Sequence, residues 1–134
     1  ASMPQWVVSK VTDALNEIEK SIKNSKILVL GLAYKKDIDD MRESPSIELI
    51  RLLKNKSAIV DYSDPHIPIF ISTSEKGYQL KSVDLTIDNI SKYDLVLIAT
   101  NHSLFNYSLI KKNAKLIVDT RGVYHEVAKN IIKA

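Results

Sequence analysis

The sequence predicts an α/β domain built around a mostly parallel sheet. Short apolar segments alternate along the chain with segments in which apolar residues recur every three or four positions. The short segments are apolar almost throughout, which is typical of strands buried on both faces. Strands that alternate with helices form βαβ units, whose strands run parallel and whose crossovers are right-handed. We therefore expect one parallel sheet covered by helices.

The first half of the chain contains a helix, a strand and a second helix. Residues 4–22 place their apolar side chains on one helical face, and the proline at the start suits a first turn. Residues 26–31 (KILVLG) form the first predicted strand. A second helix is predicted over residues 45–55, because Ser44 supplies a capping hydroxyl just before a proline.

Three further strands and a helix are predicted in the second half. The strands cover residues 58–62, 94–100 and 115–120, and each ends in polar residues. Residues 104–113 lie between the last two strands and carry enough spaced apolar residues for a modest helix.

Two parts of the chain show a weaker pattern. Within residues 67–90 we predict a short extra strand over residues 82–86, followed by a helical turn over residues 87–92. The tail, residues 123–134, is predicted to be helical.

Composition limits the classes of function. The 134 residues, of which 45% are hydrophobic, suffice for one ordinary core. The formal charge of +3 is too small for a dedicated nucleic-acid-binding surface. No apolar run approaches the roughly 20 residues that span a bilayer, and no signal-peptide pattern is present. We expect a soluble, cytoplasmic protein that binds neither nucleic acid nor membrane.

Two features that are common in nucleotide-dependent enzymes are missing from the sequence. The chain has no cysteine, so it offers no thiol nucleophile. Its three glycines, at positions 31, 77 and 122, cannot form the dinucleotide fingerprint or the P-loop. We therefore do not expect NAD to bind this chain in the usual fingerprint manner.

The longest polar segment that follows a predicted strand is residues 32–44. Ligands of open parallel sheets bind beyond the carboxyl ends of the strands. Tyr34, Lys35 and Arg42 lie there before a helix N-terminus, which suits a phosphate-bearing ligand. Acidic residues nearly balance the charge of this segment, so a solvated connection is an equally good interpretation.

Arg121 follows the last predicted strand of the sheet and would reach the same edge. Its guanidinium suits bidentate contact with an anion. An ion pair with Asp119 or Glu126 is the alternative, and spacing alone slightly favours that alternative.

Two histidines also follow predicted strands. His66 and His102, together with Asp64, would suggest a metal site, but no recognised ligand spacing or cysteine accompanies them. We expect no metal, and expect Asp64 to cap a turn over residues 64–66.

Taken together, these segments resemble the C-terminal domain of the UDP-glucose and GDP-mannose dehydrogenase family. The signature runs from Gly31 through AYKKD to RESPS at residues 42–46. Four further segments match in order: MPQWVV at 3–8, DPH at 64–66, IATNH at 98–102 and VDTRG at 118–122. Within the family, the combination is most similar to bacterial UDP-N-acetylglucosamine 6-dehydrogenases.

The resemblance implies a Rossmann-like three-layer domain. Residues 1–24 would be the end of a central helix that joins two halves of a longer protein and builds its homodimer. Residues 25–134 would be the C-terminal UDP-sugar-binding domain. An N-terminal domain of the same protein would bind most of the NAD.

The resemblance also assigns roles to individual side chains. Tyr34 and Lys35 match positions that contact the UDP-sugar substrate, and Arg121 matches an arginine that reaches the nucleotide sugar. Arg42 matches a residue that approaches NAD across the domain cleft. No catalytic residue and no metal ligand are expected in this chain.

The reaction implied is oxidation of the sugar C6 hydroxyl to a carboxylate for surface polysaccharide synthesis, by two hydride transfers to NAD through a cysteine thiohemiacetal. Because that cysteine is absent here, we expect the chain alone to be inactive. UDP-glucose as the substrate, or a stand-alone nucleotide-binding or assembly module, are the alternatives.

Overall fold

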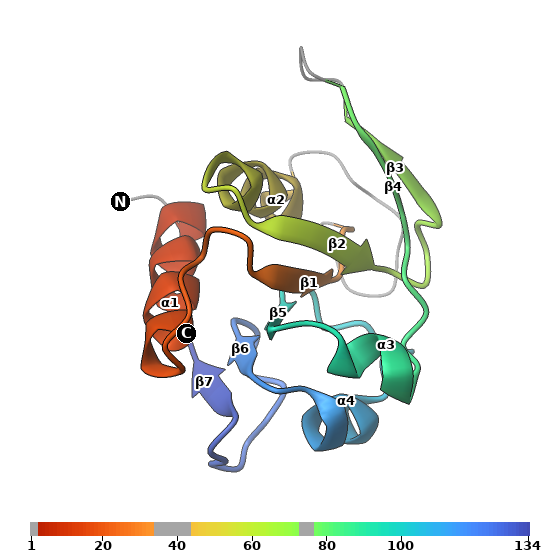
Figure 1. Cartoon of the computed structure of the whole chain (residues 1–134). Coiled ribbons are helices and arrows are strands. Elements are labelled where there is room, and N and C mark those ends of the chain that lie inside the picture. The colour runs from red at the N-terminus through yellow and green to blue at the C-terminus, as the bar shows by residue number, and fades with distance from the viewer. Residues whose placement is uncertain (1–2, 34–43, 73–76) are drawn as a thin grey trace.

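The computed structural model describes residues 3–33, 44–72 and 77–134 of the chain (Figure 1). The helices and strands alternate as expected. In chain order they are α1 (Met3–Glu17), β1 (Lys26–Leu30), α2 (Pro45–Asn55), β2 (Ile59–Ser63), β3 (Ile69–Ile71), β4 (Gln79–Lys81), α3 (Ile87–Ser91), β5 (Leu95–Ile98), α4 (Tyr107–Asn113), β6 (Ile117–Asp119) and β7 (Ile131–Lys133).

The main sheet has five strands in the order β2-β1-β5-β6-β7, and every neighbouring pair is parallel. Helices α1 and α2 lie on one face, and α3 and α4 lie on the other (Figure 1). A separate antiparallel pair, β3 and β4, extends beyond the sheet. The predicted α/β fold with a mostly parallel sheet is confirmed, as three layers.

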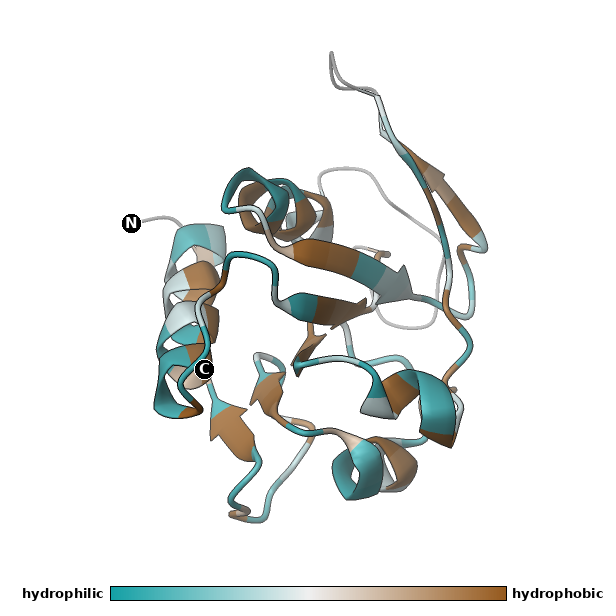
Figure 2. Ribbon diagram, viewed as in Figure 1, coloured by the Kyte–Doolittle hydropathy of each residue, from teal (hydrophilic) through white to brown (hydrophobic). Residues whose placement is uncertain are grey.

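Strand β1, which lies between β2 and β5, shows why the sequence contains continuous apolar segments. Ile27 and Val29 face the core beneath α1 and α2, whereas Leu28 and Leu30 face the core beneath α3 and α4. All four side chains are fully buried. The brown strands inside teal helix surfaces show the same distribution (Figure 2). A strand covered on both faces needs apolar residues at every position.

Helix α1 ends at Glu17, whereas the periodicity predicts a helix to about Ile22. Glu19 adopts a positive φ of 61°, and the N–H of Lys20 donates to the Leu15 carbonyl at 3.0 Å. This left-handed residue closes the last turn and redirects the chain toward β1. Ile22 still packs against the α1/α2 core, which explains why it follows the apolar pattern.

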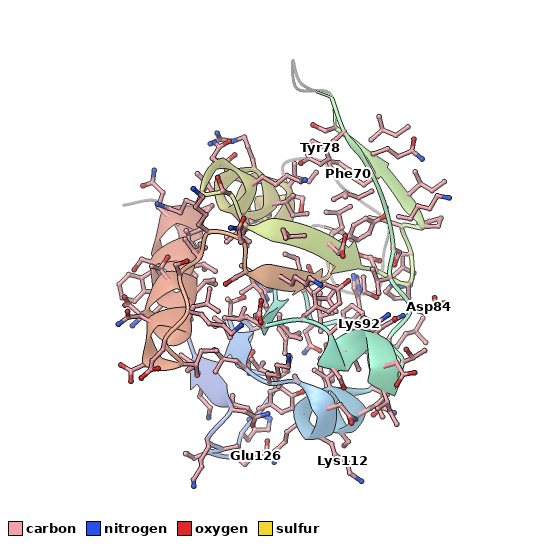
Figure 3. All side chains as sticks on the ribbon, viewed as in Figure 1. Phe70, Tyr78, Asp84, Lys92, Lys112 and Glu126 are labelled. Atoms are coloured by element: carbon pink, nitrogen blue, oxygen red, sulfur yellow. The ribbon has the colours of Figure 1, made fainter. Side chains whose placement is uncertain are left out.

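Two weaker predictions are wrong. Residues 82–86 form no strand; the strands of this region are β3 and β4. They form a hairpin on which the rings of Phe70 and Tyr78 meet edge to face at 6.0 Å (Figure 3). The tail is also not helical, because β7 pairs in parallel with β6. Short apolar runs do not distinguish helix from strand, so the free edge of β6 decides the outcome.

The remaining element predictions agree with the structure within a few residues. Ser44 caps α2 as expected, since its Oγ accepts from the N–H of Ser46 at 3.2 Å. The helical turn over residues 87–92 is α3, capped by Thr86. In the described part of the chain, no helix has the length and apolarity to cross a membrane.

Candidate functional site

The carboxyl ends of four strands lie side by side at one edge of the sheet. Ser63 of β2 is in register with Leu30 of β1, Leu30 with Ile98 of β5, and Ile98 with Asp119 of β6. The polar segments that were predicted to converge follow directly after these residues. This edge is where an open parallel sheet binds its ligands.

A pocket of about 370 Å³ opens at this edge, between the N-termini of α1 and α2 and the ends of β5 and β6. Its wall is part apolar and part polar. The residues that line it are Met3, Pro4, Val7, Pro45, Ser46, Leu49, Ala99, Thr100, Thr120 and Arg121.

The N-terminus of α2 forms part of the pocket wall. Pro45 occupies the first turn, and Ser44 caps the helix from a buried position. Pro45 has no N–H, and the N–H groups of Ser46 and Ile47 are bonded to Ser44, so the attraction for an anion here comes from the dipole of the helix end. The helix dipole therefore favours a phosphate in the pocket, which no lysine of the described residues lines.

Arg121 also lines the pocket, and its side chain is exposed. The ion-pair alternative from the sequence is wrong. The Asp119 carboxylate instead accepts from the backbone N–H groups of Arg121 and Tyr124, each at 3.0 Å. Glu126 pairs with Lys111 at 3.0 Å. The guanidinium therefore has no carboxylate partner among the described residues and remains available to a ligand.

Gly31 follows β1 directly at this edge, with a positive φ of 93°. A Cβ atom at Gly31 would lie 2.4 Å from Thr100 Cβ and 2.9 Å from the Thr100 backbone nitrogen. The Thr100 hydroxyl donates to the Ala33 carbonyl at 2.9 Å. Glycine at this position lets the segments after β1 and β5 pack directly against each other.

Asp64 is buried behind the same segments and is fully hydrogen-bonded. Its Oδ2 accepts from the N–H groups of Leu32 and Ala33, at 2.7 and 3.0 Å, and lies 3.0 Å from His102 Nε2. Its Oδ1 accepts from the His66 N–H at 2.8 Å, which confirms the predicted turn cap. Burial raises the pKa of Asp64, but the bonds from His102 and three backbone N–H groups bring it to about 2.

The two histidines lie together without forming a metal site. The rings of His66 and His102 meet edge to face at 4.9 Å. Across residues 3–33, 44–72 and 77–134, no group of three or more His, Cys, Asp or Glu side chains is placed to hold a metal ion. The Asp64–His102 pair was not predicted, because nothing in the sequence reveals which strands are neighbours of β1.

Tyr34, Lys35 and Arg42 lie outside the described residues. The flanks of their segment are described, and they meet at the site. The Ser44 hydroxyl donates to the Leu32 carbonyl at 2.6 Å. The residues before and after the segment that carries these three side chains therefore both lie at the carboxyl edge of the sheet.

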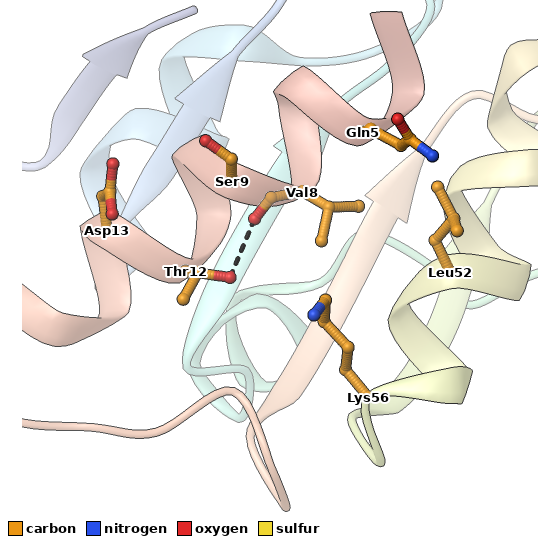
Figure 4. Close-up of a pocket in the computed structure, with 7 residues that line it drawn as sticks. All are labelled: Gln5, Val8, Ser9, Thr12, Asp13, Leu52 and Lys56. Atoms are coloured by element: carbon orange, nitrogen blue, oxygen red, sulfur yellow. Dashed lines mark hydrogen bonds between the residues drawn. The ribbon is translucent and has the colours of Figure 1, made fainter. Parts of the chain in front are cut away.

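A larger pocket, of about 520 Å³, lies between α1 and α2, away from the strand ends. Val8 and Leu52 form its apolar part, and Asp13 and Lys56 are its charged residues (Figure 4). The Thr12 hydroxyl is used within the helix, since it donates to the Val8 carbonyl at 2.9 Å. This groove lies away from the strand ends where an open parallel sheet binds its ligands, so the strand-end pocket is the better candidate.

Comparison with known families gives one match that covers most of the chain. The profile of the UDP-glucose/GDP-mannose dehydrogenase family, UDP binding domain, matches residues 28–126. The UDP-glucose 6-dehydrogenase of Rickettsia bellii is 34% identical over 130 residues, which are 90% of this chain and 28% of that protein. The UDP-N-acetyl-D-mannosamine dehydrogenase of Methanococcus maripaludis (strain C7) is 31% identical over 132 residues, 91% of this chain and 28% of that protein.

Solved structures give the same result. The UDP-D-ManNAc dehydrogenase of Pyrococcus horikoshii superposes with a TM-score of 0.77 at 26% identity, over 98% of this chain and 30% of that chain. The UDP-glucose dehydrogenase of Pyrobaculum islandicum has a TM-score of 0.68 at 27% identity, over 98% of this chain and 28% of that chain. The chain thus spans 28% to 30% of the length of these relatives.

Proposed function

This chain belongs to the UDP-glucose/GDP-mannose dehydrogenase family, where it matches the UDP-binding domain, and from this premise we propose that it holds the UDP-sugar substrate of an NAD-dependent 6-dehydrogenase. The observation that carries the proposal is the strand-end pocket. It joins a helix N-terminus to an arginine without a carboxylate partner in the described structure, as a ligand with charged phosphates requires.

The proposed roles follow the family signature. Lys35 and Tyr34 contact the UDP-sugar, and they follow directly after Ala33, which is held at the pocket edge. Arg121 contacts the nucleotide sugar from the end of β6. Arg42 approaches NAD from a segment that ends beside the pocket, at Ser44.

The described residues do not fit the primary site for NAD. Thr100 packs directly against Gly31, the glycine that follows β1. It occupies the space that the glycine of a dinucleotide fingerprint leaves open for a pyrophosphate. The chain also has no cysteine to act as the nucleophile. We therefore propose that the complete protein carries the main NAD site and the nucleophile in its other domain.

The proposed domain arrangement follows from the same premise. Residues 1–24 end the central helix that joins the two domains and forms a homodimer, and residues 25–134 form the C-terminal domain. The complete protein works in the cytoplasm and supplies a uronic acid for surface polysaccharide. This chain alone is inactive.

The proposed substrate is UDP-N-acetylglucosamine, because the segments AYKKDIDD, RESPS and DPH are most similar to that subfamily. UDP-glucose is the second candidate, because several relatives are UDP-glucose 6-dehydrogenases. Turnover of a panel of UDP-sugars with NAD by the complete protein decides between them. Absence of turnover with every member of the panel would favour a stand-alone nucleotide-binding module.

Substitutions in the complete protein test the site. Lys35→Ala and Arg121→Ala each remove a charge-assisted contact, and we expect KM for the UDP-sugar to rise about 10- to 100-fold. Arg51→Ala is the matched control, because Arg51 is exposed on α2, pairs with Glu48 and does not line the pocket. Wild-type kinetics from both Lys35→Ala and Arg121→Ala would refute the assignment.

A further inference from the structure

The buried pair of Asp64 and His102 has no role in the proposed function. Asp64 is 2% exposed and His102 is fully buried, with 3.0 Å between Oδ2 and Nε2. Asp64 follows β2, and His102 lies in the segment after β5. The two strands are not neighbours, since β1 lies between them. The pair therefore spans β1 at the carboxyl edge of the sheet.

The pair holds the chain segment that leaves β1 and lies between the two residues in space. The Asp64 carboxylate accepts from the N–H groups of Leu32 and Ala33, the residues that leave β1. It also accepts from the His66 N–H on its own turn. One carboxylate thus ties together the segments that follow β1, β2 and β5.

The fixed segment in turn holds the wall of the pocket. The Ala33 carbonyl accepts from the Thr100 hydroxyl at 2.9 Å, and Thr100 lines the strand-end pocket. The Leu32 carbonyl accepts from the Ser44 hydroxyl at 2.6 Å, and Ser44 caps α2 at the other side of the pocket. A shift of Leu32 and Ala33 would therefore move both sides of the pocket.

Chain stability alone gives little reason for such a pair. Removing a carboxylate and an imidazole from water costs free energy that their attraction offsets only when every remaining lone pair is satisfied. Apolar side chains would fill the same space without that cost. What an apolar pair would not do is accept two consecutive backbone N–H groups and so define the direction in which the chain leaves β1.

We propose that Asp64 and His102 are positioning residues for UDP-sugar binding, which hold Leu32 and Ala33 so that Thr100 and Ser44 are in place at the strand-end pocket. The pair does not touch the ligand. Its effect is transmitted through two backbone hydrogen bonds and the Thr100 hydroxyl. This inference rests on the proposed function, because it needs the strand-end pocket to be the UDP-sugar site.

Two variants of His102 in the complete protein test the pair. His102→Met keeps the approximate volume but has no donor, and His102→Gln keeps an N–H donor at a similar reach. We expect His102→Met to raise KM for the UDP-sugar, and Kd for UDP by calorimetry, about tenfold. KM for NAD should stay within about twofold, and His102→Gln should recover most of the loss.

Tyr62→Phe is the control for a variant that destabilises the core without displacing Leu32 and Ala33. Tyr62 is fully buried, and its hydroxyl donates to the Ile67 carbonyl at 2.8 Å, so removing the hydroxyl perturbs the same core but none of the hydrogen bonds of Leu32 and Ala33. We expect KM for the UDP-sugar to remain at its wild-type value. If His102 has a purely structural role, His102→Met should also show the wild-type KM for the UDP-sugar at temperatures below its melting temperature. A wild-type KM for His102→Met would therefore overturn the proposal.

A second pair of variants decides the matter if His102→Met does not fold. Thr100→Val removes the hydroxyl that donates to Ala33, whereas Thr100→Ser retains it. We expect only Thr100→Val to raise KM for the UDP-sugar. Equal KM values for the two variants would count against a role for the hydrogen bond between Thr100 and Ala33. If Lys35→Ala and Arg121→Ala also bind UDP-sugar normally, the proposed function itself fails. If they weaken binding while His102→Met does not, only the positioning role fails.

Discussion

Gly31 offers the sharpest test of the packing at the site. Its φ of 93° is in a region that residues with a side chain rarely adopt. A Cβ atom there would lie 2.4 Å from Thr100 Cβ, 2.8 Å from Thr100 Oγ1 and 2.9 Å from the Thr100 backbone nitrogen. A rotamer change of Thr100 relieves only the contact with Oγ1. The backbone after β5 must move for Gly31→Ala to fold.

The magnitude follows from two contributions. Backbone strain for a residue with a left-handed φ costs about 1–2 kcal/mol, and overpacking of a dense interior costs about 1–3 kcal/mol. The required shift also strains the two bonds by which Ala99 and Thr100 N–H donate to the Leu30 carbonyl, at 2.9 and 3.1 Å. We expect Gly31→Ala to lower the free energy of unfolding by about 3 kcal/mol or more.

Gly122 is the matched control. It has a positive φ of 66°, but an added Cβ atom would meet nothing within 4 Å. Gly122→Ala should therefore show the strain alone, about 1 kcal/mol. Urea unfolding of the 134-residue chain measures both variants, and thermal unfolding should separate their midpoints by roughly 6–10 °C. Unfolding free energies that agree within about 1 kcal/mol would refute the steric argument.

Two further predictions concern stability. The pKa of Asp64 is lowered to about 2 in the folded chain, so its stabilisation is complete above the unfolded value of 3.8 and is lost as pH falls toward 2. Asp64→Asn should lower the free energy of unfolding by about 2 kcal/mol at pH 7. The difference from wild type should shrink between pH 4 and pH 2. A difference that stays constant in urea titrations over this range would contradict the assignment. Leu97→Ala, in the fully buried centre of β5, should cost about 2–5 kcal/mol, whereas Lys111→Ala, which breaks an exposed ion pair with Glu126, should cost less than about 1 kcal/mol in the same assay.

Prediction from sequence succeeded where the local pattern is sufficient. The strand over residues 26–31 and the capped helix after Ser44 are recognisable because apolar runs and a capping hydroxyl act over a few residues. It failed at the tail, where β7 forms only because β6 presents an unpaired edge. It also extended α1 too far, because the left-handed Glu19 follows from the turn toward β1 and not from hydropathy.

The site divides in the same way. The segments after the strands were expected to converge, and the register of β2, β1, β5 and β6 brings them to one edge. The assignments of Tyr34, Lys35 and Arg42 remain predictions. For Arg121, spacing favoured an ion pair with a neighbouring acid. The structure instead gives the Asp119 carboxylate to two backbone N–H groups, because a buried carboxylate next to a turn is best satisfied by the turn itself.

The sequence by itself determined the alternation of strands and helices and the family to which the chain belongs, because periodicity and short motifs are local properties. Only the tertiary structure decided that Asp64 and His102, 38 residues apart, share a hydrogen bond. That contact depends on the order β2-β1-β5, which places both residues around the end of β1. Strand order is set by how whole faces pack on each other, and no segment of the sequence carries that information alone.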